Sequence, residues 1–216
     1  MKLFVFEHCP YCVRAMMIVG YKKLDVPFEV LQNHDVDSRI RMVGANMVPI
    51  LQKPDGSFMG ESLDIVAYLD GLDGNPLLEP PRHESAIKAW LDEAGYFSAR
   101  LLHPRNVKLG LKEYGSAEAI AWYTDKKSAA IGMSFDEAMA ATPTWLAGLN
   151  ATFAALEFVP LPSERGNRLS LDDILLYPPL RNLTAVKGVQ FGARLERYIA
   201  EVTALTGIRL FGDLAI

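Results

Sequence analysis

The sequence is poor in cysteine, in long apolar runs and in net positive charge, and each shortage excludes a class of protein. Only two cysteines occur in 216 residues, too few for a disulfide-stapled secreted scaffold. No stretch approaches the roughly 18 consecutive apolar residues of a transmembrane helix, so we expect no membrane partner. The 22 basic and 26 acidic residues give a net charge of −4, which argues against nucleic-acid binding.

The sequence also lacks the pattern of an export signal. Glu7 interrupts the first apolar stretch before a signal-peptide core has formed. We therefore expect a cytoplasmic protein, in a reducing compartment where a stable disulfide is unusual. Hydrophobic residues make up 50% of the chain and charged residues 22%, a composition typical of a chain with a packed core rather than a disordered one.

The first 72 residues alternate between strand-like and helix-like patterns. Residues 3–6 form a short apolar run, typical of a strand buried on both faces. Pro10 suits the first position of a helix, and proline, aspartate and glycine at 54–56 indicate the turn of a hairpin. Ser62 is expected to cap a further helix. The predicted order is β-α-β-α-β-β-α, with elements at 3–6, 10–23, 26–31, 35–43, 48–51, 57–59 and 62–69.

The composition changes after this region. The stretch 71–81 contains three prolines and two glycines, which indicates a linker. Beyond it the apolar residues keep helical spacing, and at Ser170 a helix start is predicted in which Asp173 reaches back to the Ser170 N–H. We therefore expect an α/β domain at 1–72, a linker at 73–83 and an all-helical domain at 84–216.

The two cysteines, Cys9 and Cys12, lie at the predicted start of the first helix with only proline and tyrosine between them. This spacing places their side chains one turn apart, about 5–6 Å between Cβ atoms, close to disulfide geometry. Cys9 at the N-cap lies at the positive end of the helix dipole, which favours its thiolate. We predict that Cys9 is a nucleophile and that Cys12 resolves the disulfide that it forms.

Three other interpretations of the cysteine pair stay open. A structural disulfide closing so short a loop would contribute only about 2 kcal/mol. A zinc site needs four ligands, and no two of the four histidines have the spacing of paired ligands, so no metal is expected. The third alternative is that both cysteines are buried and have no function. Proline beside them at a helix start argues against this alternative.

Two further pairs carry both an ordinary and a functional interpretation. Pro49 after Val48 is either an edge-strand proline or part of a cis peptide bond that leaves the Val48 backbone free to pair with an extended substrate. Glu61 and Ser62 are either an ordinary helix cap or an anion site, in which N–H groups and the Ser62 hydroxyl hold a carboxylate.

Together these residues resemble the glutaredoxin branch of the thioredoxin superfamily. The resemblance is carried by Cys-Pro-Tyr-Cys at 9–12, Met-Val-Pro-Ile at 47–50 and Glu-Ser at 61–62. The helical second half is similar to that of the large two-domain bacterial glutaredoxins of the glutaredoxin-2 type. The resemblance implies an α/β thioredoxin-like N-terminal domain followed by an all-α C-terminal domain, a glutathione-transferase-like architecture.

The resemblance also implies a glutathione site, with glutathione as co-substrate. The small glutaredoxins often carry a basic residue just before the motif, which binds the glycine carboxylate; Glu7 and His8 stand there in this chain, and Arg41 is the alternative candidate. The remaining assignments are Cys9 facing the glutathione sulfur, Val48 pairing with the cysteinyl unit, Pro49 as the cis-proline, Glu61 and Ser62 at the γ-glutamyl end, and Tyr11 beside the ligand or in a surface or core role.

The implied activity is glutathione-dependent thiol–disulfide exchange on glutathionylated and disulfide-bonded proteins, by a monomer. Two other functions stay open. A glutathione transferase would stabilise the glutathione thiolate with a hydroxyl or a single cysteine, so Cys12 would only promote oxidation there. A redox-controlled binding module would use the cysteines as sensors while the helical domain docks a partner.

Overall fold

The computed structural model describes every residue from Met1 to Ile216. The chain folds into two compact units. Unit 1 contains Met1–Leu77, Gly110–Tyr123 and Thr206–Ile208, and unit 2 contains Leu78–Leu109, Thr124–Leu205 and Arg209–Ile216. Two segments distant in sequence thus join the N-terminal residues in unit 1. The division of the chain at 1–72, 73–83 and 84–216 stays a prediction.

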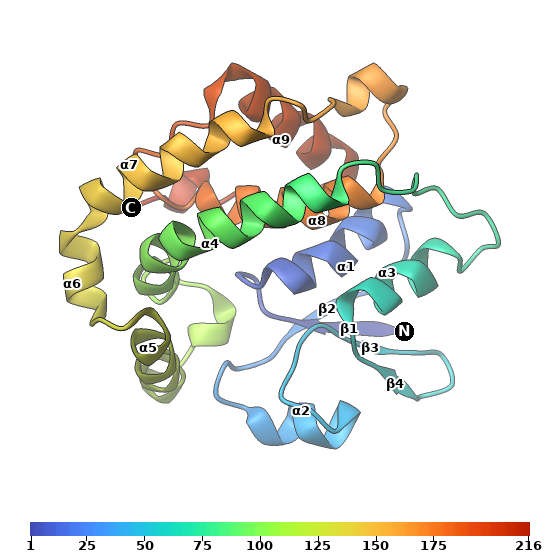
Figure 1. The fold of residues 1–216 in the computed structure, drawn as a ribbon. Helices are drawn as coiled ribbons and strands as arrows, with labels where there is room; N and C mark the ends of the chain where they lie inside the picture. The colour runs from blue at the N-terminus through green and yellow to red at the C-terminus, as the bar shows by residue number, and fades with distance from the viewer. The chain divides into compact units, whose positions relative to one another are not determined.

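Unit 1 is built on a four-stranded sheet of order β2-β1-β3-β4 (Figure 1). β1 runs parallel to β2, whereas β3 runs antiparallel to both β1 and β4. The predicted order β-α-β-α-β-β-α is confirmed. The strands are β1 (Lys2–Val5), β2 (Phe28–Val30), β3 (Ile50–Gln52) and β4 (Phe58–Met59).

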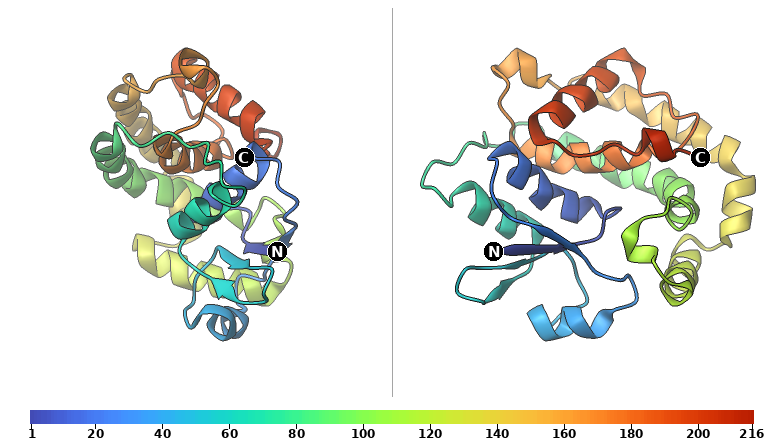
Figure 2. Two further views of the ribbon diagram at one scale, coloured as in Figure 1. Left: turned by 90° about the vertical axis from the view of Figure 1, so that its right-hand side faces the viewer. Right: turned by 180° about the vertical axis from the view of Figure 1, so that it is seen from behind.

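Three helices complete the α/β part of unit 1: α1 (Pro10–Tyr21), α2 (Val36–Val43) and α3 (Ser62–Asp70). α1 and α3 lie together on one face of the sheet and α2 lies on the other (Figure 1, Figure 2). The residues that face this packing are apolar, and Leu3, Ile18, Leu51 and Leu69 are all completely buried. Unit 1 therefore has its own hydrophobic core.

Local capping explains where α2 begins and ends. The side chain of Asp35 accepts a hydrogen bond from the Ser38 N–H at 3.1 Å, and Gly44 ends the helix with a φ of 74°. The predicted cap of α3 is wrong by one position. Ser62 is the first helical residue, and the cap position belongs to Glu61, which has a φ of 59° and makes no side-chain capping bond.

Unit 2 is helical throughout. α4 (Glu84–Asn106) packs against α6 (Phe135–Ala140), α7 (Thr142–Thr152) and α8 (Leu171–Leu183). Trp90 of α4 is almost fully buried, and its indole N–H donates to Thr152 Oγ1 at 3.1 Å. The remaining elements of the chain are α5 (Ala117–Ile131), which spans residues of both units, α9 (Gly192–Thr206), and the short 3-10 helices Lys112–Tyr114, Phe153–Leu156, Pro162–Arg165 and Gly212–Leu214.

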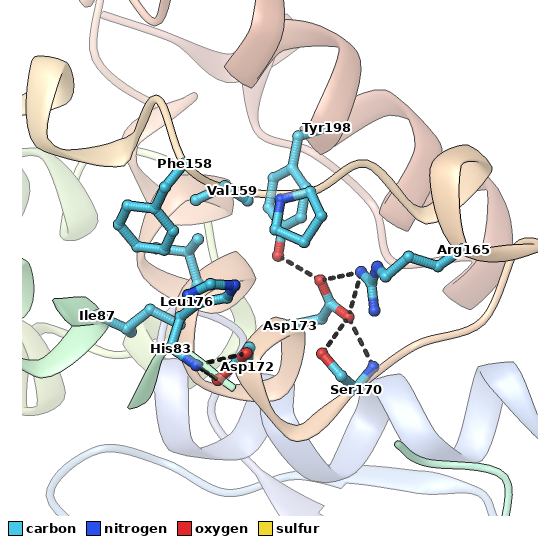
Figure 3. A pocket seen from close by; sticks show the side chains of 11 residues that line it. His83, Ile87, Phe158, Val159, Arg165, Ser170, Asp172, Asp173, Leu176 and Tyr198 are labelled. Carbon is cyan, nitrogen blue, oxygen red and sulfur yellow. Dashed lines mark hydrogen bonds and ion pairs between the residues drawn. The ribbon is translucent and has the colours of Figure 1, made fainter. Parts of the chain in front are cut away.

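The start of α8 confirms the predicted reach of Asp173 back to the Ser170 N–H, at 2.7 Å (Figure 3). The same carboxylate accepts from Arg165 and from Tyr198, at 2.8 and 2.9 Å. The small pocket beside it has a volume of about 10 Å³, room for about one water molecule. This polar cluster therefore has a structural role. α8 runs on through Pro178 and Pro179, whereas a break between α6 and α7 precedes Pro143.

None of the helices combines the length with the apolar character that a membrane span requires.

Candidate active site

Three loops of unit 1 meet at one end of the sheet. β1 ends at Val5 next to the start of β3, because Phe4 pairs with Ile50 in the antiparallel register. β4 ends beside the same point, since Met59 pairs with Leu51. The loops that follow β1, precede β3 and follow β4 therefore lie at the same end of the sheet. They include Cys9, the Val48–Pro49 pair and the Glu61–Ser62 pair.

Both cysteines are thiols at the start of α1. Cys9 occupies the N-cap and Pro10 the first helical position, as predicted from the sequence. Cys9 keeps 8% of its surface exposed, whereas Cys12 is completely buried. The sulfur of Cys12 accepts a hydrogen bond from the Phe6 N–H at 3.4 Å. Cys9 is thus the more accessible of the two cysteines.

The surroundings move the pKa values of the two thiols in opposite directions. The surroundings lower the pKa of Cys9 to about 7, and the largest cause is a hydrogen bond from the Cys12 side chain. Burial acts against this, while the charge of His8 and the backbone N–H groups of Cys12 and Tyr11 add to it. Burial, then the bond to Cys9, raises the pKa of Cys12 well above its ordinary value. When one of the two thiols ionises near neutral pH, it is therefore Cys9, and Cys12 keeps its proton.

The helix start alone, on which the sequence argument relied, is a secondary contribution. The main cause is the second thiol, and the next favourable one is the charge of His8, a contribution that was not predicted from the sequence. His8 is in turn held by Glu113, whose carboxylate accepts from His8 Nδ1 at 2.6 Å and from the His8 N–H at 2.9 Å. No sequence pattern relates residue 113 to the motif, since the contact depends on tertiary folding.

The Val48–Pro49 peptide bond is cis, as the resemblance implied. Pro49 is buried and Val48 is half-buried. No hydrogen bond within the chain occupies the backbone of Val48, which precedes the first residue of β3. The backbone of Val48, at the same end of the sheet as Cys9, therefore offers a free N–H and carbonyl to an extended ligand.

A positively charged side chain that was not predicted from the sequence contacts the first turn of α3. Arg14 of α1 donates to the Ser62 hydroxyl at 3.3 Å, and its guanidinium lies 4.7 Å from the centre of the Tyr11 ring. The Arg14 Nε is buried and has no hydrogen-bond partner. Arg41, in contrast, is exposed and donates to Ser38 of its own helix. The α3 N-terminus, with its free N–H groups, Ser62 and Arg14, thus favours an anion.

Comparisons with known proteins show the family to which the chain belongs. The sequence profile described as "Glutaredoxin 2, C terminal domain" matches residues 86–215, and the one described as "Glutathione S-transferase, N-terminal domain" matches residues 3–77. Glutaredoxin 2 of Escherichia coli K12 is 40% identical over 217 residues, with 100% of both chains covered. The chain belongs to the glutaredoxin 2 family.

Solved structures agree with this membership. Glutaredoxin 2 from Salmonella typhimurium, solved in complex with glutathione, matches this glutaredoxin with a TM-score of 0.92 at 38% identity, covering 100% of this chain and 98% of that one. A glutathione transferase of Ceriporiopsis subvermispora has a TM-score of 0.70 at 13% identity, covering 95% of this chain and 96% of that one, which shows the shared fold alone. The glutathione-transferase-like architecture is confirmed.

As a glutaredoxin, the protein is a glutathione-dependent thiol–disulfide oxidoreductase. No group of three or more histidine, cysteine, aspartate or glutamate side chains is arranged to hold a metal ion.

Proposed function

We propose that this glutaredoxin reduces protein–glutathione mixed disulfides and protein disulfides with Cys9 as the nucleophile and Cys12 as the resolving thiol. The observation that carries the assignment is the asymmetry of the two sulfurs. Cys9 is the more exposed one and has a pKa of about 7, so about half of it is thiolate at neutral pH. Cys12 is completely buried and stays protonated.

In the monothiol reaction, the Cys9 thiolate attacks the glutathione sulfur of a mixed disulfide. A bond forms between Cys9 and glutathione, and the substrate protein leaves as its thiolate. A second glutathione thiolate then attacks the sulfur of the bound glutathione. Oxidised glutathione leaves and the Cys9 thiolate is restored, so one free glutathione is consumed for each mixed disulfide that is reduced.

In the dithiol reaction, the Cys9 thiolate attacks a protein disulfide and forms a mixed disulfide with one of its sulfurs. Cys12 then loses its proton and attacks the Cys9 sulfur, which releases the reduced substrate and closes the Cys9–Cys12 disulfide. Two glutathione molecules reopen this bond. The hydrogen bond between the two side chains supports this step, because it keeps the two sulfurs adjacent.

We assign glutathione to the sheet edge at the start of α1 and α3. Its cysteinyl unit is proposed to pair with the free backbone of Val48 beside Pro49, and its γ-glutamyl carboxylate to bind at Glu61 and Ser62. The Arg14 guanidinium adds a positive charge at that end, and Tyr11, which is 54% exposed, offers a ring surface beside it. The glutathione complex of the Salmonella relative supports the choice of ligand.

Single cysteine variants test the assignment. Cys9→Ser is expected to abolish both the reduction of a glutathionylated peptide and the reduction of a disulfide-bonded protein. Cys12→Ser is expected to retain the first reaction and lose the second, because only the second needs a resolving thiol. Substantial activity of Cys9→Ser on the glutathionylated peptide would contradict the proposal.

The biological setting belongs to the same proposal. We propose glutathionylated and disulfide-bonded proteins as the macromolecular substrates and a reducing cytoplasm as the compartment, because the dithiol must be returned to its reduced form after each turnover. A monomeric state is part of the same proposal, and the division into domains at 1–72 and 84–216 stays a prediction from the composition of the linker. Sedimentation of the purified protein tests the first of these.

A further inference from the structure

Glu113 is a buried acid that the proposed reaction does not use. It lies in the 3-10 helix Lys112–Tyr114, in a segment that follows α4 in sequence but belongs to unit 1. Its side chain is completely buried. Its one ion pair is with His8, at 2.6 Å, and its second carboxylate oxygen has no partner. A buried carboxylate of this kind requires a countercharge, because desolvating a lone charge costs several kcal/mol.

The partner of the Glu113 carboxylate is the His8 ring, which balances its charge when the ring is protonated. A distance of 2.6 Å between Nδ1 and the carboxylate oxygen is typical of a charge-assisted hydrogen bond. Burial alone would raise the pKa of Glu113, but the hydrogen bonds and charge of His8 outweigh it, so the pKa is lowered and the acid stays ionised. The same oxygen accepts the His8 backbone N–H, so main chain and ring are fixed together.

Three aromatic residues also contact the His8 ring. Phe6 stacks on the imidazole at 5.8 Å and 9°, and Tyr123 meets it edge-on at 5.4 Å. The Tyr114 hydroxyl lies 3.1 Å from Nδ1. Burial raises the pKa of Tyr114, so this phenol stays neutral. The ring is thus fixed by contacts on several sides, in the residue immediately before Cys9.

We propose that Glu113 is a positioning residue for the thiol–disulfide reaction, which holds a charged His8 beside Cys9 and thereby favours the Cys9 thiolate. The carboxylate itself also acts on Cys12, where its negative charge opposes ionisation and helps to keep the proton on that thiol. Glu113 therefore contributes to the asymmetry of the two sulfurs without touching the substrate.

Several other groups face the two thiols and must be considered in any pH profile. Arg14 lies close enough to Cys9 for the two charges to interact, and the neutral Tyr114 also faces Cys9. Behind Phe6, the guanidinium of Arg39 lies 5.2 Å from the ring centre. Neither arginine ion-pairs with Glu113. A change at Glu113 therefore reaches Cys9 mainly through His8, with a smaller part through Cys12.

A purely structural role is the alternative. The segment is anchored to unit 1 by the Asn33 N–H, which donates to the Glu113 carbonyl, and by the Lys112 N–H, which donates to the Glu7 carboxylate. These bonds use other atoms than the Glu113 side chain. The isosteric variant Glu113→Gln keeps them and removes only the charge, so it separates the two roles.

The test is the pH dependence of Cys9 alkylation by iodoacetamide in the full-length protein, read by mass spectrometry of the Cys9 peptide. Glu113→Gln is expected to raise the midpoint by about half a pH unit and to lower the rate at pH 7 about two- to threefold. Glu118→Gln is the matched control, since Glu118 lies on the same segment, pairs with His34 at 3.6 Å and is 78% exposed. It is expected to leave the midpoint unchanged.

A double-mutant comparison shows whether the effect passes through His8. In the background of His8→Gln, which removes the ring charge but keeps a side-chain donor for Glu113, adding Glu113→Gln is expected to give at most a small further shift, because only the direct action of Glu113 on Cys12 remains. A full second shift there would overturn the proposal, as would an unchanged midpoint in Glu113→Gln. If His8→Gln does not fold, the comparison of Glu113→Gln with Glu118→Gln still shows whether the Glu113 charge affects the Cys9 midpoint.

This inference rests on the proposed role of Cys9. The pH curve of Cys9 alkylation in the wild type distinguishes a failure of that role from a failure of the role of Glu113. An ordinary thiol midpoint in the wild type would contradict the proposed function itself. A low midpoint in the wild type that Glu113→Gln does not move would overturn only the role of Glu113.

Discussion

Arg14 and Ser62 join the starts of two helices: the Arg14 guanidinium donates to the Ser62 hydroxyl at 3.3 Å. The contact brings a positive charge to the N-terminus of α3, where backbone N–H groups already favour an anion. Desolvation lowers the pKa of Arg14, while interaction with Tyr11 and Cys9 opposes that change. No carboxylate of the chain lies within ion-pair distance of this guanidinium, so its charge is available to a ligand.

Loss of this cation is expected to weaken glutathione binding. Arg14→Gln should raise the KM for glutathione about tenfold, which corresponds to ~1.4 kcal/mol, because a charge-assisted hydrogen bond is lost. The assay is run at pH 8.5, where Cys9 is ionised in both proteins, and the kcat should change far less than the KM. Arg41→Gln is the control, since Arg41 is exposed and bonded only within α2. An equal rise in both variants would exclude a specific role for Arg14.

The second thiol is expected to set the reactivity of the first. In Cys12→Ala the largest contribution that lowers the pKa of Cys9 is gone, so the alkylation midpoint of Cys9 should rise by about one pH unit or more. Cys12→Ser keeps a hydroxyl donor at that position and should give a smaller rise. The alkylation rate across pH 5–10 measures both. Identical midpoints in the two variants would mean that the hydrogen bond from Cys12 has little influence.

The fold and the reacting sulfurs could be read from local patterns. Strand periodicity, proline at a helix start and the turn residues at 54–56 are signals that neighbours in sequence provide, and they gave the order of elements in unit 1. The ends of the strands were less accurate. The predicted strand at 26–31 is Phe28–Val30 in the structure, because the residues that flank these pair outside the regular ladder.

The contacts that tune the site could not be read in this way. Glu113 meets His8 across a sequence separation of 105 residues, and Arg14 meets Ser62 across 48. Neither pair forms a spacing pattern, since each depends on how separate elements pack. The cap of α3 was predicted one position too late for another reason: the sequence favours Ser62 as the cap, but the residue with positive φ at the cap position is Glu61.

A buried lysine is expected to be important for the stability of unit 1. The Lys22 ammonium, with only 2% of the side chain exposed, donates to the Asp70 and Asn75 carbonyls and to the Asp73 carboxylate. Lys22→Met removes all three of these bonds and should lower the free energy of unfolding by about 2 kcal/mol. Lys23→Met, at an exposed position next to it, should change it by less than about 0.5 kcal/mol. Urea denaturation compares the two, and equal midpoints would refute the role of Lys22.

The packing of α4 against α7 in unit 2 requires a residue without a side chain at position 148. A Cβ on Gly148 would overlap the ring of Phe97, so Gly148→Ala should destabilise the protein by about 1–3 kcal/mol. Gly95 of α4 has no neighbouring atom within 4 Å of such a Cβ, and Gly95→Ala should be neutral or stabilise by up to about 1 kcal/mol. Thermal unfolding monitored by circular dichroism gives both values. A stabilised Gly148→Ala would show that the helices have room to separate.

The ionisation of Cys9 underlies the whole catalytic account, and one titration tests it most directly. The rate of Cys9 alkylation in the wild-type protein is measured from pH 5 to pH 10, with the modified residue identified by mass spectrometry. The account predicts a single rise with a midpoint near pH 7, set by Cys12 and His8. A midpoint at about 8.5, the value of an ordinary cysteine, would contradict it.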